Sequence, residues 1–219
     1  MSANRSPSRP AALASMSDGI PKRATYADVE AAPEHLVAEI IRGELMTHPR
    51  PSIRHGAAAA ALAAALGPAF QKGPGGPGGW IFFVEVEIKF GEDLLVPDLS
   101  GWRVEHFPGD PEQNYFTTRP DWICEILSGS TEKRDRSLKM SIYGEAGVPH
   151  LWLIDPRLQL LEAFESQASG WTKVGAWNSA DEVRAPPFDA TAFSLADLWP
   201  LDKPLGFNED PQPLYAGDR

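Results

Sequence analysis

The chain has 219 residues, of which 42% are hydrophobic and 23% charged, enough for one sizeable hydrophobic core. The composition excludes a disulfide framework, because Cys124 is the only cysteine, and no stretch approaches the roughly 18 apolar residues of a membrane span. The net charge of −10 argues against non-specific nucleic-acid binding by the whole surface, although a local basic groove is compatible with it. The first residues lack the apolar core of a signal peptide, so we expect a cytoplasmic protein with Cys124 as a buried apolar residue.

The N-terminal half of the sequence predicts a tail, a short helix, a strand pair and a longer helix. Thr25 and Asp28 have the spacing of a capping box at the start of a helix. Arg42 and Gly43 divide an apolar segment into two strands joined by a tight turn. The expected ranges are a disordered tail at 1–20, a helix within 25–34, the strand pair within 35–49, a helix over 51–70 and a glycine-rich loop over 73–79.

The segment 80–90 alternates between apolar and polar residues, which is typical of a strand. We predict that its apolar residues share one face from Trp80 to Phe90. A turn at 91–93 returns the chain as a second strand over 94–102, so the whole stretch is expected to form a hairpin. Pro97 cannot donate a hydrogen bond to a strand ladder, so Asp98 is expected at an edge or a bulge.

The second half continues with strands around one further helix. A helix between two strands suggests one β-α-β crossover, and Gly147 is expected to end that helix. The chain is therefore expected to be a mixed α/β (α+β) protein. The expected ranges are a polar loop at 103–119, a strand at 122–127, the helix at 131–146, strands at 148–155, 158–165 and 170–177, and an acidic segment from 176 that crosses the surface with a short helix at 194–199; a single domain would span 21–200 and a C-terminal tail 201–219.

Glu125 stands in the middle of the apolar run WICEIL, where an unpaired charge costs several kcal/mol. Counting about 100° per residue along the following helix, Lys139 borders the apolar stripe and can approach Glu125 if the helix packs on the sheet. With Asp98 on a neighbouring strand, two carboxylates and an amine would suit Mg²⁺ or Mn²⁺ and metal-assisted phosphodiester hydrolysis. Alternatively, Glu125 only pairs with Lys139 or Arg134 as a structural ion pair, and Asp98 caps a turn.

Several sequence blocks resemble the Uma-type family of restriction endonucleases within the PD-(D/E)XK nuclease superfamily. The resemblance covers about residues 25–165, and its blocks are AEIIRGEL at 38–45, PSIRH at 51–55, VPDLS at 96–100, PDWICEILSGST at 120–131 and DRSLKMSIYGEAGVPHLWLIDP at 135–156. It implies a restriction-endonuclease-like core, with a mixed central β-sheet flanked by helices. It also implies that Asp98 and Glu125 bind the metal and that the protein is a DNA endonuclease. Double-strand cleavage needs two sites, so by analogy with the fold we expect a homodimer.

The sequence departs from the usual superfamily pattern, which places lysine two residues after the glutamate, where this chain has Leu127. In the Uma-type branch the lysine lies on the following helix, at the position of Lys139. Glu39 and His55 also match family positions. Glu39 would contact the metal through water or pair with Arg42, and His55 would touch phosphate or be a structural histidine.

Three further residues of the 131–146 helix are candidates for supporting roles. Asp135 can hold Lys139 through an i,i+4 pair, and Tyr143 either borders the site or packs in the core. Arg134 belongs to a local basic patch that could meet a phosphate backbone. The other members expected in this patch are Lys133, Arg136, Arg50 and Arg54.

A different interpretation is a catalytically inactive module that keeps the fold and acts as a homodimeric or partner-binding protein. Trp171, Trp177 and Trp199 would then be exposed and bury a partner surface, unless they pack at the edge of their own domain.

Overall fold

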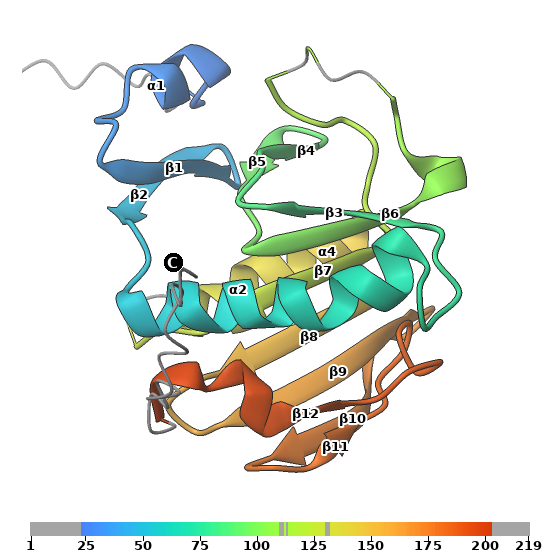
Figure 1. Cartoon of the computed structure of the whole chain (residues 1–219). Coiled ribbons are helices and arrows are strands. Elements are labelled where there is room, and N and C mark those ends of the chain that lie inside the picture. Colours follow the sequence, from blue (N-terminus) through green and yellow to red (C-terminus); the bar gives the residue numbers. More distant parts are fainter. Residues whose placement is uncertain (1–22, 110–111, 113, 130–131, 203–219) are drawn as a thin grey trace, which may run out of the picture.

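A six-stranded mixed sheet with strand order β10-β9-β8-β7-β6-β3 forms the centre of the molecule (Figure 1). The computed structural model describes residues 23–109, 112, 114–129 and 132–202, so the expected tail at 1–20 and nearly all of that at 201–219 lie outside the described residues. All neighbouring strands are antiparallel except β7 and β8, whose parallel pairing confirms the expected β-α-β crossover. The strands are β3 Trp80–Val84, β6 Leu99–Arg103, β7 Trp122–Ile126, β8 His150–Asp155, β9 Leu160–Gln167 and β10 Gly170–Asn178.

A smaller sheet with strand order β2-β1-β5-β4 lies beside the central one (Figure 1). The tight turn between its first two strands is confirmed, and Arg42 and Gly43 both have positive φ, 54° and 82°. A glycine favours this left-handed region because it has no Cβ. The strands are β1 Leu36–Ile41, β2 Glu44–Pro49, β4 Ile88–Phe90 and β5 Asp93–Leu95, and a two-stranded ribbon adds β11 Glu182–Val183 and β12 Phe193–Ser194.

Helices cover both faces of the central sheet. The helix α2 covers one face and starts at the N-cap Ser52, whose side chain accepts a hydrogen bond from the backbone N–H of His55. The other face carries three contiguous helical segments, of which the middle one is π-helical, and Gly147 follows them with φ 73°. The helices are α1 Tyr26–Glu30, α2 Ile53–Leu66, η1 Gly67–Lys72, η2 Val104–His106, α3 Glu132–Arg134, η3 Asp135–Lys139, α4 Met140–Glu145, η4 Leu195–Leu198 and η5 Pro200–Asp202. Every helix in the described part of the chain is too short or too polar to span a bilayer.

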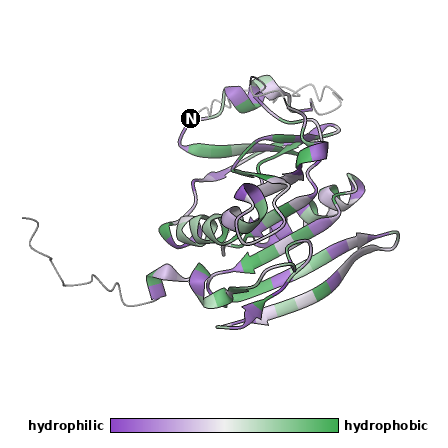
Figure 2. Cartoon of the chain, turned by 45° about the vertical axis from the view of Figure 1, so that its right-hand side comes forward, coloured by the Kyte–Doolittle hydropathy of each residue, from purple (hydrophilic) through white to green (hydrophobic). Residues whose placement is uncertain are grey.

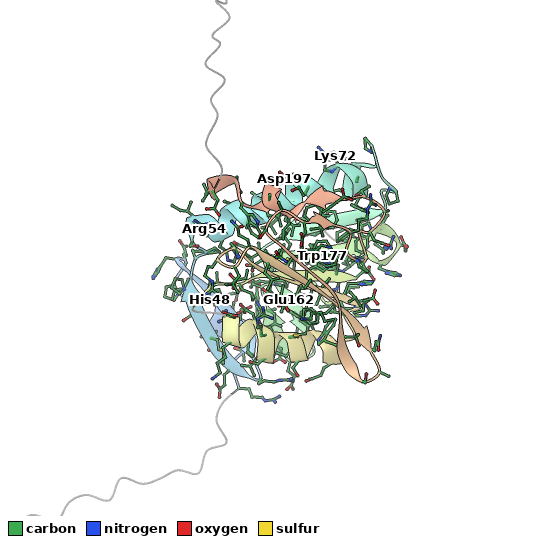
Figure 3. The ribbon with its side chains drawn as sticks, turned by 90° about the horizontal axis from the view of Figure 1, so that it is seen from below. His48, Arg54, Lys72, Glu162, Trp177 and Asp197 are labelled. Carbon is green, nitrogen blue, oxygen red and sulfur yellow. The ribbon has the colours of Figure 1, made fainter. Side chains whose placement is uncertain are left out.

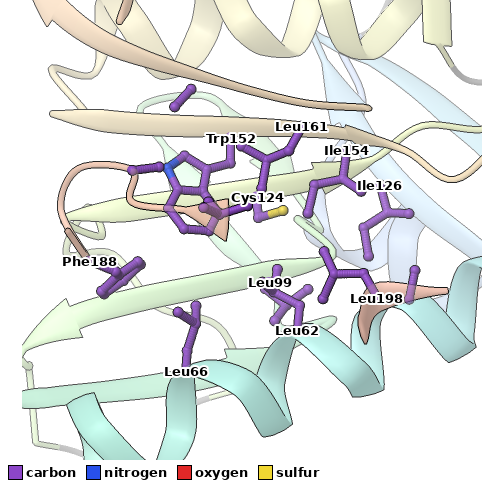
Figure 4. Close-up of a cluster of buried hydrophobic side chains, with 14 of the residues drawn as sticks. Leu62, Leu66, Leu99, Cys124, Ile126, Trp152, Ile154, Leu161, Phe188 and Leu198 are labelled. Atoms are coloured by element: carbon purple, nitrogen blue, oxygen red, sulfur yellow. The ribbon is translucent and has the colours of Figure 1, made fainter. Parts of the chain in front are cut away.

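The alternation of side chains along β7 divides the core into two layers. Trp122, Cys124 and Ile126 belong to one cluster of buried residues that also holds Leu62 and Leu66 of α2. Figure 4 shows Cys124 within this cluster, so it is a buried apolar residue as expected. Ile123 and Leu127 point the other way, into the cluster beneath the α3–η3–α4 segment. Glu125 lies between them in sequence and therefore faces this second layer.

The prediction of one continuous strand over 80–90 is wrong. The chain breaks after Val84, where Glu85 has a positive φ of 50°, and β3 and β4 belong to different sheets. Val84 is 49% exposed and does not share a buried face with Trp80. The expected hairpin persists in two parts, because β3 pairs with β6 and β4 pairs with β5.

The prediction that the segment after 176 only crosses the surface is also wrong. Phe188 and Leu198 pack into the core layer beneath α2 (Figure 4), and Trp199 is buried there as well. Trp177 packs against the same layer, whereas the indole N–H of Trp171 donates to the Met140 carbonyl. Within the described residues, these contacts favour the alternative that the three tryptophans pack in their own domain over the exposed surface that a partner-binding module would need. In Figure 2, hydrophilic and hydrophobic residues alternate along the β9–β10 hairpin, as expected for a sheet with one covered face.

Candidate active site

Asp98 and Glu125 lie side by side on two neighbouring strands. Leu99 of β6 pairs with Cys124 of β7 in an antiparallel register, so the preceding Asp98 lies next to the following Glu125. Asp98 occupies the bend between β5 and β6, directly after Pro97, where the strand ladder is interrupted as the sequence predicted. Both carboxylates line one cavity of about 200 Å³.

Two donors fix the Asp98 carboxylate. Its Oδ2 accepts the backbone N–H of Ile126 at 2.6 Å, and its Oδ1 contacts Nε2 of His55 at 2.9 Å. Burial acts to lower the pKa of His55, but the hydrogen bond and charge of Asp98 outweigh it and raise that pKa. Each carboxylate oxygen has two lone pairs, so Asp98 keeps acceptor capacity towards the cavity.

Lys139 lies between two buried carboxylates. Its Nζ is 2.8 Å from Oε1 of Glu125 and 3.0 Å from Oε1 of Glu39, and it donates to the Val96 carbonyl at 3.3 Å. The expected approach of Lys139 to Glu125 is confirmed. The ammonium has three N–H donors, so these three acceptors engage all of them.

Glu39 reaches the same cluster from β1 of the smaller sheet. It is fully buried, and its Oε1 also accepts the Val96 N–H at 2.9 Å. Burial acts to raise its pKa, but the charge of Lys139 and contacts with His48, Val96 and Arg134 lower the pKa to about 2. The alternative that Glu39 pairs with Arg42 is wrong, because Arg42 is bonded to Glu145 on α4.

The surroundings of Glu125 oppose the ionisation of its carboxyl group. Burial is the main cause that raises its pKa to about 8, and the charges of Asp98 and Asp135 add to it, while Lys139 opposes the shift. The phenol of Tyr143 donates a hydrogen bond to Oε1 of Glu125. Tyr143 is therefore both a core residue and a contact of the site.

The π-helical turn η3 places Asp135 and Lys139 on the buried side of the helix, as the helical periodicity predicted. Leu138, which that prediction placed on the apolar stripe, is 37% exposed at its edge. Asp135 lines the cavity, and its Oδ1 is 3.7 Å from Nε of Arg134. The proposed i,i+4 pair with Lys139 stays a prediction.

The rim of the cavity carries cationic side chains. Arg134 and Arg50 line it, together with His48, which the sequence pattern did not predict as a site residue. Nε2 of His48 and Nη2 of Arg134 each lie 3.6 Å from Oε2 of Glu39, an oxygen with no hydrogen-bond partner among the described residues. The pairing of β2 with β1 brings His48 to the rim of the cavity, and Figure 3 shows where His48 lies. The spacing of residues in the sequence does not reveal this position.

The rest of the expected basic patch is neutralised or turned away. Nη1 of Arg54, at the start of α2, donates to both carboxylate oxygens of Asp202 at 2.8 Å. Arg136 pairs with Glu162 on β9 and Glu132 on α3, and Lys133 is exposed outside the cavity lining. Arg50 and Arg134 are thus the two arginines of the patch that face the cavity.

The donors of the cavity fit a hard divalent cation. Among the described residues, no group of three or more His, Cys, Asp or Glu side chains could hold a metal ion. Mg²⁺ usually takes one or two carboxylates and keeps several waters, so Asp98 and Glu125 suffice as protein ligands. A cation between them would offset the repulsion from Asp98, which adds to the effect of burial in raising the pKa of Glu125.

The same fold occurs in known proteins. Residues 24–196 match the model of the Uma2 family, which is described as "Putative restriction endonuclease". A solved structure from Anabaena variabilis, described as "a putative nuclease belonging to DUF820", superposes with a TM-score of 0.66 and 24% identity, covering 80% of this chain and 97% of that one. A search of curated proteins finds no match.

The fold is therefore the expected mixed α+β architecture, with a central mixed sheet flanked by helices. Because the family match spans most of its length, this chain belongs to the Uma2 family.

Proposed function

We propose that this protein is a Mg²⁺- or Mn²⁺-dependent endonuclease that hydrolyses DNA phosphodiester bonds. The carrying observation is the convergence of Asp98, Glu125 and Lys139 at one cavity, although they are far apart in the sequence. Membership of a family described as restriction endonucleases, and a structural neighbour described as a nuclease, support a nuclease rather than another hydrolase.

In this proposal, the residues that line the cavity have different roles in the reaction. Asp98 and Glu125 would hold the cation, which polarises a phosphoryl oxygen and lowers the pKa of water. His55 and the Ile126 N–H orient the Asp98 carboxylate, and Lys139 holds Glu125. For Lys139 to orient water, as the sequence pattern suggested, it must release one of its three acceptors. Arg134 and Arg50, which line the cavity, would contact the phosphate backbone.

The proposal is tested by incubating the protein with supercoiled plasmid and single-stranded DNA in Mg²⁺, Mn²⁺ or EDTA. We expect metal-dependent cleavage by the wild type and loss of cleavage in Asp98→Asn. Asp202→Asn serves as the control, because Asp202 pairs with Arg54 outside the cavity. A wild type that leaves both DNAs intact, or an Asp98→Asn variant as active as the wild type, would contradict the proposal.

The alternative of a non-catalytic partner-binding module has lost its main support, because Trp199 is buried and Trp171 and Trp177 contact their own chain.

A homodimer remains part of the proposal, since cutting both strands needs two sites. Sedimentation of the purified protein at several concentrations tests it, and a monomer throughout would contradict it.

A further inference from the structure

The side chain of Tyr143 has two kinds of contact, one through its apolar ring and one through its hydroxyl group. Its side chain is fully buried on α4, and its ring lies edge-on to Phe90 with centroids 5.4 Å apart. Its hydroxyl donates a hydrogen bond to Oε1 of Glu125, which lies on β7. A phenylalanine would fill the same space, so packing alone does not explain the hydroxyl.

Two donors converge on one oxygen of Glu125. Lys139 and Tyr143 are four residues apart on the helical segment, so both project from one side onto Oε1. A carboxylate oxygen has two lone pairs, and these two donors match both. Oε2 is then the oxygen towards which neither donor is directed, while the Glu125 side chain lines the cavity.

We propose that Tyr143 is a positioning residue that anchors Oε1 of Glu125, so that Oε2 is presented to a divalent cation. This inference rests on the proposed metal-dependent function. Lys139 alone would hold Oε1 by a flexible four-carbon chain, whereas the ring of Tyr143 is fixed by its packing. Partners that orient a metal ligand affect metal affinity even though they do not touch the metal.

The test compares Tyr143→Phe with the matched control Tyr26→Phe. Tyr26 also lies near a carboxylate, that of Glu87, but it lines a separate cavity. Mn²⁺ affinity is measured by titration calorimetry, beside the thermal unfolding of the metal-free proteins. We expect Tyr143→Phe to bind Mn²⁺ about 10- to 100-fold more weakly and Tyr26→Phe to bind like the wild type.

A wild type that binds Mn²⁺ while Tyr143→Phe binds it within twofold would overturn the positioning role and leave the metal site intact. A wild type that binds no Mn²⁺ would overturn the proposed function and the positioning role together. If Tyr143→Phe does not fold, Tyr143→Met replaces it, because methionine also lacks the donor and fits irregular apolar space. The same affinity criteria then decide the outcome.

Discussion

Lys139 is a single ammonium group shared by two buried carboxylates. Burial acts to lower its pKa, but the charges of Glu125 and Glu39 raise it, so the lysine stays protonated. Both carboxylates and the amine are at most 3% exposed. Removing one partner of such a cluster leaves buried charge without compensation.

We predict that Lys139→Ala lowers the free energy of unfolding by about 3–5 kcal/mol, measured by urea denaturation in EDTA. Lys133→Ala, at an exposed position earlier in the same helical segment, is the control and should change it by less than about 0.5 kcal/mol. Equal stabilities of the two variants would show that the cluster does not stabilise the fold.

Glu125→Gln should behave differently, because burial and neighbouring acids already oppose the charge of Glu125. We expect its metal-free stability to lie within about 1 kcal/mol of the wild type. The wild type should gain about 2.7 kcal/mol from Mg²⁺ at 100 times its dissociation constant, and the variant should gain nothing. Thermal unfolding with and without Mg²⁺ measures this, and an equal Mg²⁺ shift in both proteins would exclude Glu125 as a ligand.

At the scale of single residues, periodicity was sufficient to relate Lys139 to Glu125. The strand period put Glu125 on the face of Ile123 and Leu127, and the helix period put Lys139 on the buried side. His48 could not be predicted, because its place depends on how a separate sheet packs beside the site. Periodicity reports which face of an element is buried, but not what lies opposite.

At the scale of elements, periodicity again does not report which segments pack together, and this explains why the prediction of one continuous strand over 80–90 is wrong. Alternation continues through Val84 and Glu85, but the positive φ of Glu85 sends the two halves into different sheets. This break allows the smaller sheet to carry Glu39 towards the cavity formed by the central sheet. The local pattern holds no information on that change of sheet.

The turn between β8 and β9 offers a test of element stability. Asp155 is buried and accepts hydrogen bonds from the Arg157 guanidinium and from the N–H groups of Arg157 and Leu158. Burial acts to raise the pKa of Asp155, but these hydrogen bonds outweigh it and lower the pKa. The stabilisation is therefore present above the unfolded-state pKa, near about 3.9, and lost as pH falls through the lower folded-state value.

We predict that Asp155→Asn reduces stability by about 1–3 kcal/mol at pH 7, and that the difference from the wild type shrinks as pH falls below about 4. Urea denaturation across this pH range measures it. Leu158→Ser, at a residue 65% exposed in the same turn, is the control. A difference that stays constant with pH would contradict the charged role of Asp155.

At the scale of the whole molecule, the net charge of −10 opposes the approach of DNA. Two of the four arginines of the expected patch, Arg54 and Arg136, pair with acids outside the cavity, so we expect few phosphate contacts from the protein itself. We predict that a labelled duplex binds at least about 10-fold more tightly with Ca²⁺ than with EDTA, as measured by fluorescence anisotropy at fixed ionic strength. Asp98→Asn should remove the Ca²⁺ effect, and tight binding in EDTA would contradict this view.

Anomalous scattering from a crystal soaked in Mn²⁺ would locate the proposed metal ion directly. We predict one peak within coordination distance of a carboxylate oxygen of both Asp98 and Glu125, with Tyr143 and Lys139 still on the opposite oxygen of Glu125. A soaked crystal with no peak there, or with its peak away from either carboxylate, would contradict metal binding by Asp98 and Glu125.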